Sequence, residues 1–395
     1  MMNFEHLLAT RTQAMGVNVI REILKVVSQP GMISLAGGIP SPDSFPMARM
    51  RELTERVLEK YQSRAFQYDL TEGFIPLREA LVDFFHHKNI TASVDDITIQ
   101  SGSQGVLDAL GRVLISPGDK VAVEAPTYLA AIQAFRAYEA EFVRLEMDDD
   151  GLIPESLEEV LRTQKVKFVY VIPTFQNPTG RSVTLERRQQ IGEIVQTYQT
   201  LLIEDDPYSA LRYRGDALPA IKTFAPENTV YVTTLSKVLA PGLRIGICVA
   251  PPLIKKWMTI VKQGVDLHTS TFNQAIAAEY ISGGYLAEQL PKIIQLYRPK
   301  QEAMLDALER YFPEDFTWSK PEGGMFIWAE GPEELDMEKL HWKAIERKVA
   351  YVPGKFFYSQ AGEGNSTMRL NFTMVDEATI ERAIQILGDV FKQER

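Results

Sequence analysis

Short apolar segments alternate with amphipathic segments through the middle of the chain, and this alternation limits the possible folds more than any other feature. An uninterrupted apolar run between turn residues is typical of a buried strand, whereas apolar residues three and four apart are typical of a helix. Strands this apolar, separated by helices, predict a mostly parallel sheet covered on both faces, as in a doubly wound α/β domain. The expected strands are 97–99, 121–123, 168–172, 201–203, 230–232 and 245–249, and the expected helices include 76–88, 104–114, 129–138, 156–161 and 185–198.

The pattern changes after a long helical region. Strands and helices become mixed there, which predicts a smaller α+β domain of about 100 residues. At the amino terminus, the first 30 residues are interpreted as an arm with one amphipathic helix around 19–27. The chain therefore divides into the arm with part of the small domain (1–47), a large domain (48–285) and a small C-terminal domain (286–395). The elements expected beyond the large domain's strands are a helical region at 272–312, strands at 325–328, 350–352 and 368–372, and a helix at 376–392.

The composition argues against several classes of partner. The net charge of −10 offers no basic field for nucleic acid or for an anionic membrane. No apolar run approaches the roughly 20 residues that a membrane-spanning helix needs, and the first residues do not resemble a signal peptide. The five histidines lack metal-ligand spacing, so we expect no metal site. The single cysteine, Cys248, cannot form an internal disulfide, and a reduced cytoplasmic location is expected.

One stretch, 233–246, carries a lysine with the surroundings of a nucleophile. Lys237 follows an apolar strand, where desolvation and a nearby cation lower the pKa of an amine and leave it reactive toward a carbonyl. The neighbouring hydroxyls and Arg244 resemble the walls of a phosphate pocket. Taken by itself, the stretch is more simply interpreted as a surface loop with a solvated lysine, because short motifs often match by chance.

Polar clusters at the ends of successive strands favour the functional interpretation. In open α/β sheets, ligands bind beyond the carboxyl ends of the strands. A serine-rich turn opens a helix after the first strand, an aromatic residue follows the second, and acids follow the fourth. With the lysine, these residues supply an amine, a carboxylate, a phosphate cradle and an aromatic cover, which a pyridoxal phosphate site requires. The clusters are 101–105, 126–128, 176–180, 204–208 and 237.

The chain resembles the class I/II aminotransferases, pyridoxal phosphate (PLP) enzymes of fold type I, over essentially its whole length. Within that family it is most similar to the group of 2-aminoadipate, kynurenine and aromatic aminotransferases. The motifs that carry the resemblance are Ser34–Pro40 (SLAGGIP), Ser101–Gln104 (SGSQ), Asn177–Gly180 (NPTG), Glu204–Tyr208 (EDDPY), Ser236-Lys237 with Pro241–Gly246 (PGLRIG), and Arg369–Phe372 (RLNF).

The resemblance implies a role for each motif residue. Lys237 would form the Schiff base with the cofactor and then move the substrate proton, while Asp205 would pair with the pyridine nitrogen. Arg369 would bind the substrate α-carboxylate, with Gly38 and Asn177 beside it. The remaining cofactor contacts would be Asn177 and Tyr208 at the ring's 3′ oxygen, Tyr128 stacked on the ring, and Ser103, Gln104, Thr234, Ser236 and Arg244 at the phosphate. Position 234 is Thr where the family more often has Ser, which makes that phosphate contact the least secure.

Two further residues match positions of the family, and each also has a structural alternative. Tyr68 matches a tyrosine that reaches a neighbouring subunit's cofactor phosphate, which implies a homodimer; the alternative is a core aromatic. Arg21 matches an arm arginine that meets an acidic or aromatic substrate side chain; the alternative is a solvated helix face.

The resemblance implies an enzyme that moves an amino group between an L-amino acid of the 2-aminoadipate, aromatic, kynurenine or glutamate type and a 2-oxo acid such as 2-oxoglutarate. One alternative is a PLP-dependent β-lyase on the same scaffold, because fold does not determine chemistry. A second is an aminotransferase-like domain of a transcription regulator, which the acidic balance disfavours.

Overall fold

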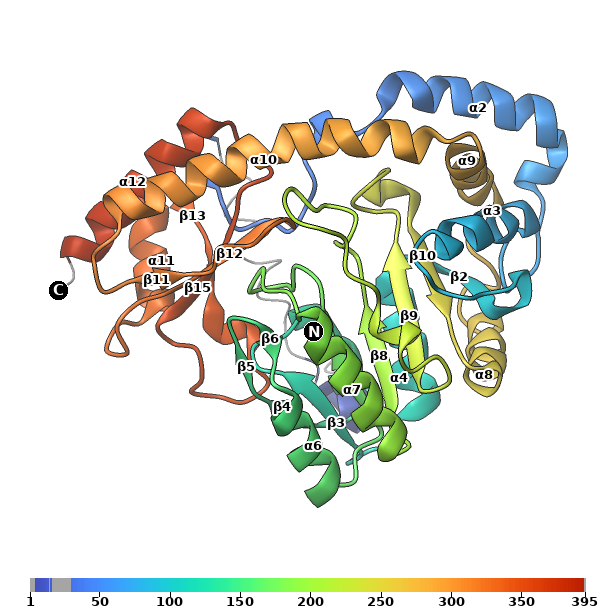
Figure 1. Cartoon of the computed structure of the whole chain (residues 1–395), viewed down its shortest axis with the longest axis horizontal. Helices are drawn as coiled ribbons and strands as arrows, with labels where there is room; N and C mark the ends of the chain where they lie inside the picture. Colours follow the sequence, from blue (N-terminus) through green and yellow to red (C-terminus); the bar gives the residue numbers. More distant parts are fainter. Residues whose placement is uncertain (1–3, 14, 16–29, 394–395) are drawn as a thin grey trace.

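The computed structural model describes residues 4–13, 15 and 30–393 of the chain. Figure 1 shows a large twisted sheet with helices around it and a smaller C-terminal lobe beside it. The long helix α10 (Tyr285–Tyr311) runs along both parts and packs against α12 (Glu377–Gln393) in the smaller lobe. The predicted arm helix around 19–27 and Arg21 lie outside the described residues.

The large sheet has seven strands in the order β2-β10-β9-β8-β7-β3-β4. Four neighbouring pairs are parallel, and β10 is antiparallel to both of its neighbours. The predicted mostly parallel α/β sheet is therefore confirmed. The strands are β2 (Ile97–Ser101), β3 (Lys120–Glu124), β4 (Glu141–Leu145), β7 (Phe168–Val171), β8 (Leu201–Asp205), β9 (Thr229–Thr234) and β10 (Ile245–Val249).

Helices cover both faces of this sheet (Figure 1). All of the expected large-domain helices are present, whereas α2 and α8 were not predicted. The helix expected at 156–161 begins two residues earlier, at Pro154, and the Ser156 hydroxyl accepts the Glu146 N–H. The helices are α2 (Met47–Tyr61), α3 (Ile75–His86), α4 (Ser103–Leu114), α5 (Leu129–Arg136), α6 (Pro154–Thr163), α7 (Leu185–Thr197), α8 (Pro252–Gln263) and α9 (Thr271–Ser282).

The smaller lobe is built on a four-stranded antiparallel sheet in the order β11-β12-β15-β14. The expected helical region 272–312 is two helices, α9 and α10, because Gly284 adopts a left-handed conformation between them. The other elements are β11 (Thr317–Trp318), β12 (Phe326–Glu330), α11 (Met337–Glu346), β13 (Val349–Ala350), β14 (Val352–Pro353) and β15 (Thr367–Asn371).

A segment from the beginning of the chain joins this lobe. Strand β1 (Ile33–Ser34) pairs in parallel with β13. This pairing brings the segment that follows β1 close to β15, where Asn371 donates its N–H to the Leu35 carbonyl. The division at residues 47 and 285 stays a prediction. Within the described part of the chain, no helix is long and apolar enough to cross a membrane, and no three His, Cys, Asp or Glu side chains are grouped to bind a metal.

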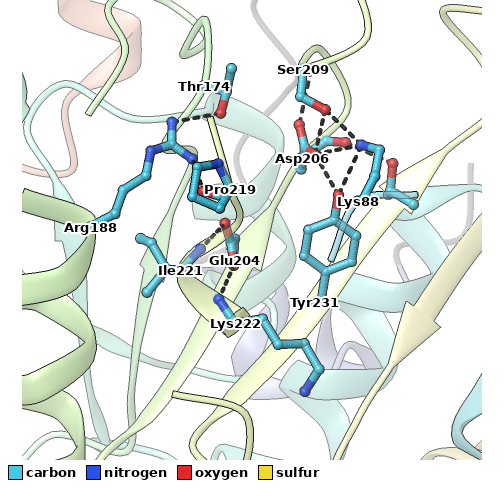
Figure 2. A network of polar contacts seen from close by, with 11 residues as sticks. Lys88, Thr174, Arg188, Glu204, Asp206, Ser209, Pro219, Ile221, Lys222 and Tyr231 are labelled. Atoms are coloured by element: carbon cyan, nitrogen blue, oxygen red, sulfur yellow. Dashed lines mark hydrogen bonds and ion pairs between the residues drawn. The ribbon is translucent and has the colours of Figure 1, made fainter. Parts of the chain in front are cut away.

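A buried guanidinium donates hydrogen bonds to several loops at the carboxyl edge of the large sheet (Figure 2). Arg188, on α7, is 1% exposed. Its guanidinium donates to the carbonyls of Val183, Pro173 and Pro219 at 2.6–3.0 Å and to the Thr174 hydroxyl at 2.8 Å. Since buried carbonyls need a donor, this one side chain satisfies three separate loop positions.

Replacing Arg188 with Met should lower the free energy of unfolding by about 3–5 kcal/mol, because the carbonyls of Val183 and Pro219 lose the guanidinium as their donor and that of Pro173 keeps the Val183 N–H. Arg162→Met is the control, since Arg162 is 62% exposed and pairs with Glu159 on the same helix; its cost should stay below about 1 kcal/mol. Urea denaturation of both variants measures the difference. Equal, small effects would contradict the anchoring role of Arg188.

Candidate active site

A cavity of about 330 Å³ lies at the carboxyl ends of the large sheet's strands and extends to β15 of the smaller lobe. Its wall includes nearly every residue that the sequence motifs single out, although they come from segments more than 300 residues apart. The predicted residues on this wall are Gly38, Ser103, Gln104, Tyr128, Asn177, Asp205, Tyr208, Thr234, Ser236, Lys237, Arg244 and Arg369.

Lys237 follows β9 and points its amine into this cavity. Its Nζ donates to the Gly38 carbonyl at 3.1 Å. Burial, and then the positive charges of Arg369 and Arg244, lower the pKa of the Lys237 amine to about 8. A substantial fraction of this amine is therefore neutral, and nucleophilic, close to neutral pH.

Asp205 ends β8 and is 2% exposed. Its Oδ2 accepts the Tyr170 hydroxyl proton at 2.8 Å, whereas its buried Oδ1 has no hydrogen-bond partner among the described residues. Burial raises the pKa of this carboxyl to about 7; the Tyr170 bond opposes the rise and the charge of Asp206 adds to it. A buried oxygen without a partner is costly unless a ligand donates to it, and a protonated ring nitrogen is such a donor.

The turn before α4 forms a cradle for an anion. Gly102 has φ +82°, and a Cβ at this position would lie 2.3 Å from Nη2 of Arg244, so only glycine fits under the guanidinium. A Cβ at Gly246 would lie 2.2 Å from the Gly102 carbonyl carbon. This close packing sets Arg244 beside the N-terminus of α4, which begins at Ser103 and carries free backbone N–H groups.

The two hydroxyls on the β9 side of the cradle differ in their availability. Thr234 donates to the Ile245 carbonyl at 2.8 Å and accepts the Ser236 N–H at 3.1 Å. Because the Thr234 proton is bonded to Ile245, the Ser236 hydroxyl is the donor in its 2.9 Å contact with Thr234, and its proton can turn to an anion without breaking a bond to the backbone. Ser236 is therefore the better placed of the two to bind an anion.

Arg369, on β15, is buried at the cavity wall opposite the large sheet. Its Nη1 donates to Asn177 Oδ1 at 2.8 Å and its Nη2 to the Ala36 carbonyl at 2.7 Å. Burial lowers the pKa of the guanidinium to about 10, so it keeps its charge at neutral pH. The group also lies 4.3 Å from the Phe326 ring centroid. Two hydrogen bonds and a ring hold its plane, which prepares it to bind a carboxylate.

Tyr208 faces the same cavity from the turn after β8. Burial raises the pKa of its phenol far above the usual value, so the hydroxyl stays protonated and can donate a hydrogen bond. Burial also raises the pKa of Tyr128, on the neighbouring wall.

Of the two remaining predicted residues, Arg21 lies outside the described residues and Tyr68 does not line the cavity. Tyr68 is 75% exposed, with its ring 5.6 Å from that of His268, so the alternative interpretation as a core aromatic is wrong.

Sequence patterns missed several residues that support the site. Tyr170 was taken as part of an apolar strand, although its hydroxyl holds Asp205. Gln176 donates to Glu124 and to the Pro126 carbonyl, both at 2.9 Å, and so joins the loop before Tyr128 to the loop that carries Asn177. A phenol or a carboxylate within an apolar strand was the available signal for Tyr170 and Glu124.

The arrangement fits PLP on the evidence of its own donors and acceptors. The cavity offers an amine for the aldehyde, an unpaired buried carboxylate oxygen for the ring nitrogen, and a cationic cradle for the phosphate. The guanidinium of Arg369 remains for a substrate carboxylate.

Comparison with known proteins agrees with this geometry. Residues 30–387 match the family model for aminotransferase class I and II. The chain is 46% identical to aromatic-amino-acid aminotransferase 1 of Thermococcus litoralis over 100% of this chain and 96% of that protein. It is 37% identical to the 2-aminoadipate transaminase of Thermus thermophilus over 97% and 95%.

A solved structure extends the likeness to the fold and the cofactor. The kynurenine aminotransferase of Pyrococcus horikoshii superimposes with a TM-score of 0.95 at 44% identity, covering 99% of this chain and 98% of that one, and it was solved in complex with PMP. PMP is the amino form of the PLP cofactor, so this neighbour holds the cofactor that the cavity fits. The chain therefore belongs to the class I and II aminotransferases, and it is a PLP-dependent enzyme that transfers amino groups.

Proposed function

We propose that this enzyme transfers the amino group of an aromatic amino acid, 2-aminoadipate or kynurenine to a 2-oxo acid such as 2-oxoglutarate, with glutamate as the reverse donor. The observation that carries the proposed chemistry is the convergence of Lys237, Asp205 and Arg369 on one cavity. The substrate class is supported by the relatives, which bear the names of aromatic, 2-aminoadipate and kynurenine aminotransferases.

We infer distinct roles for these three residues. PLP, when bound, supplies an electron sink that makes the substrate Cα proton acidic. Asp205 would hold the pyridine nitrogen in its protonated form through Oδ1, while Tyr170 fixes the other oxygen. The amine of Lys237, with its pKa near 8, would accept the Cα proton and return it during the reaction. Arg369 would bind the α-carboxylate and so orient the Cα–H bond.

The remaining site residues would hold the cofactor. Ser103 and Gln104 at the start of α4, together with Ser236 and Arg244, would bind the phosphate. Tyr208 and Asn177 would hydrogen-bond the 3′ oxygen, and Tyr128 would stack on the ring. We assign Thr234 to supporting the wall of the phosphate site rather than to the phosphate itself, because its own proton is bonded to the Ile245 carbonyl and its oxygen accepts from the Ser236 N–H and hydroxyl.

We further propose that the active unit is a homodimer in which Tyr68 completes the partner's phosphate site. Tyr68 lies outside its own chain's cavity and is largely exposed. Other aromatic and aliphatic side chains are exposed around it, including Phe66 and Leu70. An exposed apolar cluster of this kind is typical of an interface.

Two broader assignments accompany this proposal. We propose that 1–47 and 286–395 form one structural unit beside 48–285, which the pairing of β1 with β13 supports. A reducing, cytoplasmic location is consistent with the single cysteine, Cys248, which is buried and free.

The reaction can be tested by mixing the PLP-loaded protein with tyrosine, kynurenine, 2-aminoadipate or glutamate. The expected result is a change of the cofactor's visible absorption and, with 2-oxoglutarate present, equimolar keto-acid exchange. Release of ammonia without exchange would instead support the β-lyase. No spectral response to any of these donors would contradict the proposed substrate class.

The lowered pKa of Lys237 predicts the pH dependence of its reactivity in the cofactor-free protein. An amine whose pKa is about 8 is mostly neutral above pH 8 and loses reactivity as the pH falls below that value. Reductive alkylation by a small aldehyde, followed by peptide mapping, should therefore have a midpoint near pH 8 at Lys237, against about 10.4 for a solvated lysine. Lys237→Ala identifies the peptide, and a midpoint above pH 10 would refute the assignment.

Subunit complementation tests the shared site. Lys237→Ala and Tyr68→Ala should each have little activity at limiting PLP. After co-expression, half of the dimers would be mixed and would contain one intact site, so about a quarter of the wild-type activity should return. A mixture no more active than the separate variants would argue against a contribution of Tyr68 across subunits.

A further inference from the structure

Three acids in succession, Glu204, Asp205 and Asp206, have three different environments at the end of β8. Glu204 accepts the backbone N–H groups of Ile221 and Lys222, both at 2.8 Å. Asp205 faces the cofactor cavity. Asp206 points into a separate polar network that the proposed chemistry does not use (Figure 2).

This network centres on an ion pair between distant parts of the chain. Lys88, in the turn after α3, places Nζ 3.1 Å from Asp206 Oδ2, 2.7 Å from the Ser209 hydroxyl and 3.2 Å from the Tyr231 hydroxyl. Tyr231 also donates to Asp206 Oδ2. Asp206 is 6% exposed and the Lys88 side chain 23% exposed, so water screens this pair only weakly.

Asp206 in turn closes the loop that carries Tyr208. Its Oδ1 accepts the Ser209 N–H at 3.0 Å and its Oδ2 the Ser209 hydroxyl at 2.6 Å, so the carboxylate spans Pro207 and Tyr208. The backbone of Asp206 is held on β9 by its N–H to the Val232 carbonyl at 2.8 Å and by the Thr233 hydroxyl, which donates to the Asp206 carbonyl at 2.7 Å. The Asp206 carboxylate therefore helps to fix the backbone of the turn that carries Tyr208.

The charge of Asp206 also acts on its neighbour. Although burial opposes ionisation, Lys88 and the hydroxyls of Ser209 and Tyr231 lower the pKa of Asp206 to about 2. The resulting fixed negative charge contributes, after burial, to the raised pKa of Asp205. Lys88 faces this charge from the far side of the turn, away from the cofactor cavity.

We propose that Lys88 is a positioning residue of this aminotransferase: through Asp206 it holds the turn that presents Asp205 and Tyr208 to the cofactor ring. This inference rests on the roles proposed above for Asp205 and Tyr208. Lys88 itself does not line the cavity. Its effect on the reaction is transmitted by the carboxylate of Asp206.

The test compares Lys88→Met, Lys88→Arg and Asp206→Asn with wild type and with Lys167→Met. Lys167 pairs with Asp119 at 3.2 Å, a similar ion pair next to the amino end of β7 and far from the turn. Each PLP-loaded protein is titrated across pH while its visible absorption is recorded, and kcat and KM are measured. If Tyr208 is displaced, its hydrogen bond to the charged 3′ oxygen of the cofactor becomes weaker. The pH at which the visible absorption changes should then shift by about one unit.

Lys88→Met should raise the pH at which the visible absorption changes by about one unit. It should also lower kcat about tenfold or more, with KM for the amino acid nearly unchanged. Lys88→Arg should recover most of both values, and Lys167→Met should match wild type. If Lys88→Met does not fold, Asp206→Asn must show the shift. Wild-type titration and kcat in the folded Lys88 and Asp206 variants, with only a lower Tm, would overturn the inference. A wild-type protein without the visible band would instead overturn the proposed function itself.

Discussion

The active site depends on one carboxylate that is buried without a cation of its own. Asp205 has a single hydrogen bond, from Tyr170, and an oxygen that nothing in the described chain satisfies. Such a group is unfavourable in the ionised form until an opposite charge lies against it. In the proposed assignment, a bound protonated pyridine ring would remove this cost, so the cofactor and the carboxylate would stabilise each other's charged forms. Asp205 lies at the carboxyl end of β8, the central strand of the large sheet.

Successive side chains along β8 and its turn point in different directions, so the two acids beside Asp205 do not enter the cofactor cavity. Glu204 turns toward backbone N–H groups and Asp206 toward Lys88, so neither occupies the cavity. Both also brace loops at the carboxyl edge of the sheet. In the proposed assignment, one short acidic segment thus supplies the electrostatic partner of the cofactor and two structural anchors. A substitution at any of the three acids is expected to have its own distinct consequence.

The smaller lobe contributes a positive charge, the guanidinium of Arg369, to the cavity wall opposite the large sheet. Arg369 reaches the cavity from β15, and its two hydrogen bonds go to Asn177 in the loop after β7 and to Ala36 of the segment after β1. Three distant parts of the chain therefore meet at one guanidinium. If Arg369 binds the substrate carboxylate as we propose, its position relative to Lys237 sets the geometry of proton transfer.

Much of this arrangement could be predicted from the sequence, because buried parallel strands are continuous apolar runs and their carboxyl ends are marked by polar clusters. The edge strand β4 was missed because its residues alternate between buried and exposed. The partners of the site were missed for a different reason. Tyr170 and Lys88 lie 35 and 118 residues from the acids that they contact, so only the folded chain reveals these pairs.

The protonation state of the bound cofactor tests the central claim most directly. With PLP labelled with ¹⁵N in its ring, NMR of the wild-type enzyme should show a protonated pyridine nitrogen across about pH 6 to 9, because the ionised Asp205 stabilises it. In Asp205→Asn, with the cofactor still bound, the nitrogen should lose its proton. An unprotonated nitrogen in the wild-type enzyme, or a protonated one that is indifferent to this substitution, would contradict the account.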